Sequence, residues 1–104
     1  MTDFSRHDAV FIWGYGREGR AVLSHVLDAA PDLAIVVIDA REPADLPTGV
    51  TWAGEDDLES LCREADAPLI VKSPGVSLYD PRLDAAMKAG ARLINTARGP
   101  IVDE

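Results

Sequence analysis

Cysteine, histidine and lysine are scarce in this chain of 104 residues. The single cysteine, Cys62, excludes an internal disulfide and a cysteine-rich metal site. His7 and His25 lack metal-ligand spacing, so we expect both to be surface or packing residues. No G-x-x-x-x-G-K-[ST] motif is present, because neither Lys72 nor Lys88 has the required upstream glycine. The chain therefore shows no means of hydrolysing ATP by that route, and it also lacks a nucleophile elbow.

Basic residues are also few, with 10 Lys and Arg against 18 Asp and Glu and a net charge of −8. This balance argues against nucleic acid or an anionic membrane as partner. No run of 18 apolar residues and no signal-peptide pattern is present, so we expect a soluble, cytoplasmic protein. The length and the apolar fraction of 47% predict a single globular domain over residues 1–104, with residues 1–8 as a loose lead-in.

Short apolar segments alternate with helical patterns along the chain. Strands are predicted at residues 9–13, 34–39, 50–53, 69–71 and 92–94. The second segment is apolar on both faces, which suits a central parallel strand. Alternating strands and helices with short links predict an α/β fold: a Rossmann-like five-stranded parallel sheet of order 3-2-1-4-5 with helices on both faces.

Three helices are predicted between these strands. The first ends at Pro31, the second has Asp56 or Asp57 as its cap, and the third begins at Asp80 and ends at Gly90. The residues expected to face the core of the third helix are Leu83 and Met87. Other residues expected in the core are Trp13, Trp52 and Cys62.

Residues 9–20 carry three glycines between a strand and a helix. Gly14 permits a tight turn, Gly16 lets the backbone approach a phosphate, and Gly19 lets the helix pack close to the sheet. Asp39 lies 20 residues beyond Gly19 and can accept hydrogen bonds from ribose hydroxyls. This arrangement predicts a mononucleotide- or dinucleotide-binding site. The alternative is a tight glycine turn in a domain without a ligand.

A second candidate loop, Ser73-Pro74-Gly75-Val76-Ser77, follows the fourth strand. Ser73 and the backbone N–H groups of this loop can hydrogen-bond a phosphate or a base, while Pro74 and Gly75 shape a turn. An ordinary strand-to-helix connection is the alternative interpretation.

Four basic residues follow predicted strands: Arg17, Arg41, Lys72 and Arg98. Because open α/β sheets bind ligands at the carboxyl ends of their strands, we expect this edge of the sheet to be locally cationic and suited to a phosphate or carboxylate. The alternative is that exposed loops simply carry charged residues.

Residues 9–94 resemble the N-terminal domain of the UDP-N-acetylmuramoyl-L-alanine:D-glutamate ligases, a group of Mur ligases of peptidoglycan synthesis. The matching segments are residues 14–20, Asp39-Ala40-Arg41, residues 73–77, and an alanine-rich helix from Pro81 to Gly90. The resemblance implies that the domain binds the UDP part of the muramoyl substrate. Arg17 and Glu18 would face the diphosphate, Asp39 and Arg41 the uridine, and residues 73–75 would line the same pocket. ATP and Mg²⁺ would act elsewhere in the parent ligase, so this chain alone would not be catalytic.

The tail, residues 93–104, resembles D-2-hydroxyacid dehydrogenases instead. This second resemblance implies an NAD site with Asp39 on the adenosine ribose and Arg98 on the substrate carboxylate. Glu18 stands where those enzymes usually have an apolar residue, and Ser-Pro-Gly replaces their usual loop. The sequence also stops before the point where their catalytic Glu and His are expected. A regulatory nucleotide sensor or a scaffold without ligand is a third hypothesis.

Overall fold

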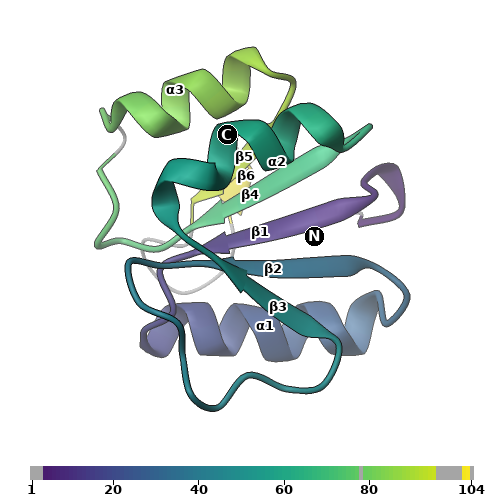
Figure 1. Ribbon diagram of the computed structural model, residues 1–104. Helices are drawn as coiled ribbons and strands as arrows, with labels where there is room; N and C mark the ends of the chain where they lie inside the picture. The colour runs from purple at the N-terminus through teal and green to yellow at the C-terminus, as the bar shows by residue number, and fades with distance from the viewer. Residues whose placement is uncertain (1–3, 78, 96–101, 104) are drawn as a thin grey trace.

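The computed structural model describes residues 4–77, 79–95 and 102–103, which form a three-layer α/β domain (Figure 1). One sheet runs in the order β3-β2-β1-β4-β5-β6. Its strands are β1 (Ala9–Trp13), β2 (Ala34–Ile38), β3 (Val50–Ala53), β4 (Pro68–Lys72), β5 (Arg92–Asn95) and β6 (Val102–Asp103). The predicted order of five parallel strands is confirmed. The two-residue strand β6 adds an antiparallel edge that was not predicted, because two residues carry no readable alternation.

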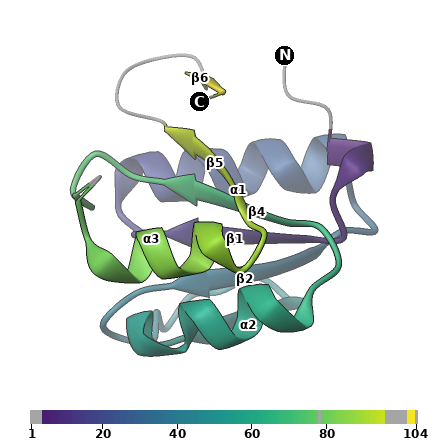
Figure 2. The same ribbon diagram turned by 90° about the horizontal axis from the view of Figure 1, so that it is seen from above.

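Helices cover both faces of the sheet (Figure 2). Helix α1 (Arg17–Ala29) lies on one face, and α2 (Leu58–Glu64) and α3 (Pro81–Lys88) lie on the other. Strand β1 is buried along its whole length and divides the core. Val10 and Ile12 pack with α1, while Phe11 and Trp13 pack with α2 and α3. Within the described residues, no helix has the length and apolar character needed to span a membrane.

Helix α3 begins and ends as its sequence predicts. The Asp80 carboxylate accepts a hydrogen bond from the Arg82 backbone N–H, and Gly90 takes a φ of 116° beyond the last turn. Met87, however, was wrongly predicted to face the core. It is 43% exposed, and Ala86 is buried beside Leu83 in its place. Positions 86 and 87 are both neighbours of Leu83 on the helix, three and four residues on, so spacing alone does not decide which of them is buried.

Several smaller expectations also differ from the structure. Residues 4–6 form a short 3₁₀ helix, η1, whose Phe4 is buried, so the lead-in is not loose from that residue onward. A second 3₁₀ helix, η2 (Glu55–Asp57), precedes α2, and the Asp57 side chain makes no cap hydrogen bond. Trp52, which was expected in the core, is only partly buried. Trp13 is fully buried, as expected. Cys62 is buried, and burial raises the pKa of its thiol to about 11.

Replacing Asp80 with alanine is expected to lower the free energy of unfolding by about 1 kcal/mol at neutral pH, because it removes an N-cap acceptor. The cap and the Arg82 guanidinium hold the pKa of Asp80 below its usual 3.8. A lowered folded-state pKa means that this stabilisation is present above pH 4 and is lost as the pH falls through the folded value. Urea unfolding of wild type and D80A at pH 7 and pH 3 measures both effects. D84A, which removes an exposed acid of the same helix, is the control. If the difference in unfolding free energy between wild type and D80A is the same at pH 3 as at pH 7, the lowered pKa of Asp80 is contradicted.

Candidate nucleotide-binding site

Three loops meet at the carboxyl ends of the adjacent strands β1, β2 and β4. The Gly14 backbone N–H donates to the Ile38 carbonyl at 2.8 Å, and the Ser73 N–H donates to the Trp13 carbonyl at 3.0 Å. The sheet therefore places the glycine loop, Asp39 and the Ser-Pro-Gly loop side by side. These are the three motifs singled out in the sequence, and this edge is where open α/β sheets bind ligands.

Each glycine at the start of α1 has the geometry that its predicted role requires. Gly14 has a φ of +92°, and a Cβ there would lie 2.2 Å from the Ser73 Oγ. A Cβ on Gly19 would lie 2.1 Å from the Gly14 carbonyl oxygen, so only glycine lets α1 start this close to the loop. Around Gly16 nothing lies within 4 Å of a built Cβ. The backbone at Gly16 therefore faces open space at the start of α1, which fits the approach of a phosphate.

Asp39 follows β2, and its carboxylate points back to the glycine loop. One oxygen accepts from the Tyr15 backbone N–H at 2.9 Å, and the other accepts from the Ala40 N–H at 2.7 Å. The Trp52 indole donates to the Asp39 carbonyl at 3.0 Å. The carboxylate is thus fixed in position, and each oxygen keeps a lone pair that can accept a hydroxyl. Contact with a ribose stays a prediction.

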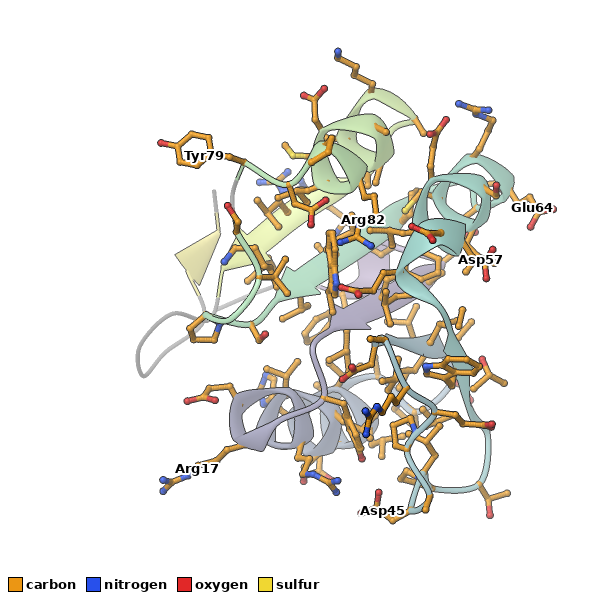
Figure 3. All side chains as sticks on the ribbon, turned by 60° about the vertical axis from the view of Figure 1, so that its left-hand side comes forward. Arg17, Asp45, Asp57, Glu64, Tyr79 and Arg82 are labelled. Carbon is orange, nitrogen blue, oxygen red and sulfur yellow. The ribbon has the colours of Figure 1, made fainter. Side chains whose placement is uncertain are left out.

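The predicted cluster of basic side chains at this edge of the sheet is only partly present. Arg17, the first residue of α1, and Arg41, in the loop between β2 and β3, are exposed, and Figure 3 shows Arg17 projecting outward from the start of α1. Lys72 is 3% exposed and donates to the carbonyls of Ser73 and Val76, so its expected place as a surface cation was wrong. Arg98 lies outside the described residues. Exposed Glu18 adds an acid to the first turn of α1.

Sequence analysis missed a link between α1 and the β2–β3 loop. The Arg20 guanidinium lies over the Tyr15 ring, 4.4 Å from its centroid, and is paired with Asp45 at 2.5 Å. The pair raises the pKa of Arg20 and lowers that of Asp45. This contact holds the loop that carries Arg41 beside the glycine loop. The two partners are 25 residues apart, a separation at which no periodic pattern connects them.

A second missed cluster lies on the α2–α3 side, around Arg82 (Figure 3). The Arg82 guanidinium lies 5.7 Å from the Trp13 ring centroid and pairs with Asp80 at 2.9 Å. Glu55 accepts from the Trp13 indole at 2.8 Å and faces Arg82 at 3.7 Å. The carboxylates raise the pKa of Arg82. Arg82 thereby joins α3 to η2 across the end of β1. In the described part of the chain, no three His, Cys, Asp or Glu residues are grouped to hold a metal ion.

Across residues 3–104 the sequence matches the NAD binding domain of D-isomer specific 2-hydroxyacid dehydrogenases. The chain belongs to this family. The match extends beyond the tail and includes Asp39, for which the same resemblance implied a place in an NAD site. The dehydrogenase resemblance is therefore confirmed.

Curated relatives of this NAD-binding-domain family member confirm the Mur ligase resemblance as well. The chain is 33% identical over 99 residues to UDP-N-acetylmuramoylalanine–D-glutamate ligase of Aliivibrio fischeri, covering 90% of this chain and 22% of that protein. It is 35% identical over 89 residues to UDP-N-acetylmuramoyl-L-alanine–L-glutamate ligase of Xylella fastidiosa, covering 82% of this chain and 19% of that protein. The chain thus spans about a fifth of the length of these relatives.

Among solved structures, UDP-D-quinovosamine 4-dehydrogenase from Vibrio fischeri superimposes with a TM-score of 0.67 at 16% identity, covering 94% of this chain and 93% of that chain. At this identity the likeness shows the fold alone. It agrees with the Rossmann-like topology of the sheet.

Proposed function

We propose that the chain is the UDP-binding N-terminal domain of a Mur ligase that adds D-glutamate to UDP-N-acetylmuramoyl-L-alanine in peptidoglycan synthesis. One observation carries the proposal: the Ser-Pro-Gly loop packs on the glycine loop, with the Ser73 Oγ against Gly14, while Asp39 bonds to Tyr15 on the other side. The three segments that resemble the Mur ligases therefore lie side by side at the carboxyl ends of β1, β2 and β4. The identity to curated ligases over 90% of the chain supports the same assignment.

The proposed roles follow from the position of each loop. Gly16, Arg17 and Glu18 stand at the start of α1, where backbone N–H groups attract a diphosphate. Asp39 and Arg41 flank the β2 side and would bind the uridine. Ser73, Pro74 and Gly75 would line the site from the opposite side, where they follow β4. The open space at Gly16 and the fixed Asp39 carboxylate support these roles.

The chain by itself would bind substrate without catalysing a reaction. In the parent ligase, ATP and Mg²⁺ would supply the phosphoryl group that activates the muramoyl carboxylate, and neither would be held by residues of this chain. Arg17, Asp39 and Ser73 would instead hold the UDP end and so orient the distant reacting end. We place such a ligase in the cytoplasm, with no nucleic acid or membrane as partner.

The family match over residues 3–104 favours a second candidate, the NAD-binding domain of a D-2-hydroxyacid dehydrogenase. Asp39 would then accept the hydroxyls of the adenosine ribose, and the glycine loop would hold the pyrophosphate. Arg98 would bind the substrate carboxylate in a completed enzyme.

Calorimetric titration with UDP and with NADH distinguishes the two candidates. We expect UDP to bind at micromolar concentration and NADH to bind much more weakly. R17A should weaken UDP binding about tenfold, because it removes a cation beside the diphosphate. R63A removes another exposed arginine, on α2 and away from the three loops, and should leave binding unchanged. Micromolar NADH binding without a UDP response would reverse the order, and binding of neither nucleotide would favour a domain without this ligand.

A further inference from the structure

Among the described residues, Lys72 is the one charged side chain that is buried. It ends β4 and is only 3% exposed. Removing an ammonium group from water costs several kcal/mol unless hydrogen bonds compensate. Here the Nζ donates to the Val76 carbonyl at 2.8 Å and to the Ser73 carbonyl at 3.1 Å.

The two residues that Lys72 binds are the two that press on the glycine loop. A Cβ on Gly14 would meet the Ser73 side chain at 2.2 Å and the Val76 side chain at 3.7 Å. Ser73 and Val76 also close a turn, because the Val76 N–H donates to the Ser73 carbonyl at 3.1 Å. Lys72 therefore fixes both ends of the turn that packs against the glycine loop.

We propose that Lys72 is a positioning residue for the ligand's diphosphate. Its ammonium holds the Ser73–Val76 turn against Gly14 and places a positive charge behind this turn, without touching the ligand. A charge in a dry, buried position is screened less than one on the surface, so it acts on a nearby anion more strongly than Arg17 or Arg41 do per unit charge at equal distance. This inference rests on the proposed function, since it needs a diphosphate bound at the glycine loop.

The matched pair K72M and K88M tests the proposal. Both substitutions replace a lysine with an unbranched apolar side chain, but Lys88 lies on the exposed face of α3 in a pair with Asp84. Binding of UDP and of uridine is measured for each by calorimetry. We expect K72M to weaken UDP binding about tenfold or more while uridine binding changes little, because uridine carries no phosphate. K88M should change neither. Equal losses for UDP and uridine, or no loss, would overturn the role.

A measurement on the wild type covers the case in which K72M fails to fold. Held by two carbonyls and shielded from water, the Lys72 ammonium should exchange its protons slowly enough to give an NMR signal that Lys88 lacks. This signal should shift on addition of UDP and stay in place on addition of uridine. An unchanged signal at saturating UDP would overturn the proposal. If NADH binds and UDP does not, the proposed function fails, and the same comparison with NADH and adenosine decides the role of Lys72.

Discussion

Replacing Gly19 with alanine is expected to lower the melting temperature of the domain by about 10 °C. The added Cβ would lie 2.1 Å from the Gly14 carbonyl oxygen and 3.1 Å from its carbon, and these are backbone atoms that no side-chain rotation can move. Overpacking of this kind costs about 3 kcal/mol, whereas alanine gains about 1 kcal/mol over glycine in a helix. The net loss of about 2 kcal/mol corresponds to such a shift in a domain of this size.

Gly16→Ala is the matched control for G19A, because Gly16 is the N-cap of α1, three residues before Gly19. A Cβ at Gly16 meets nothing within 4 Å, and its φ of −89° suits any residue. We therefore expect G16A to lose less than about 1 kcal/mol, the difference between glycine and alanine at an N-cap. Calorimetric melting and circular dichroism measure both variants. If G19A melts with the wild type, α1 does not start as close to the loop as the structure places it.

Replacing Asp39 with asparagine is expected to weaken nucleotide binding by about 10- to 100-fold, the effect of losing hydrogen bonds to a charged acceptor. The substitution keeps the shape of the side chain but turns one acceptor oxygen into an NH₂ donor. That donor must face the backbone N–H of either Tyr15 or Ala40, since the carboxylate now accepts from both. The side chain would rotate away, and the acceptors for the ribose would be lost with it.

Asp32→Asn supplies the control for D39N, because Asp32 is an exposed acid before β2, at the opposite end of that strand. Titration with UDP, and with NADH for the second candidate, compares the two variants with the wild type. Equal affinities for D39N and wild type would remove Asp39 from the site, whichever nucleotide binds. Loss of affinity in D32N as well would point to a general effect of charge.

Local patterns predicted most of this fold. The β-branched run at 34–38, the glycine triplet and the Asp80-Pro81 cap each encode their structure within a few residues, so strands, order and helix limits could be predicted from the sequence. The errors concern three-dimensional surroundings. Whether Met87 or Ala86 faces the sheet depends on the exact setting of α3. Whether Lys72 points to water depends on the turn that folds back over it.

The site shows the same division between local and distant information. The three loops were predicted because each follows a strand, and parallel strands bring their carboxyl ends together. The Arg20–Asp45 pair and the Trp13–Glu55 hydrogen bond join residues 25 and 42 positions apart, for which the sequence offers no spacing rule. Nucleotide identity is encoded less directly still. UDP and NAD share a diphosphate, and the glycine loop recognises that shared part through its backbone.

Because Cys62 is buried, the reaction of its thiol with thiol reagents reports on unfolding of the domain. The thiol is fully enclosed beneath α2, and with a pKa of about 11 it is almost entirely protonated at neutral pH. Thiol reagents attack the thiolate, so they reach this sulfur only when the helix separates from the sheet. The rate of alkylation therefore measures how often α2 separates from the sheet. For the same reason, a cysteine introduced on the surface can be labelled with a fluorophore without competition from Cys62.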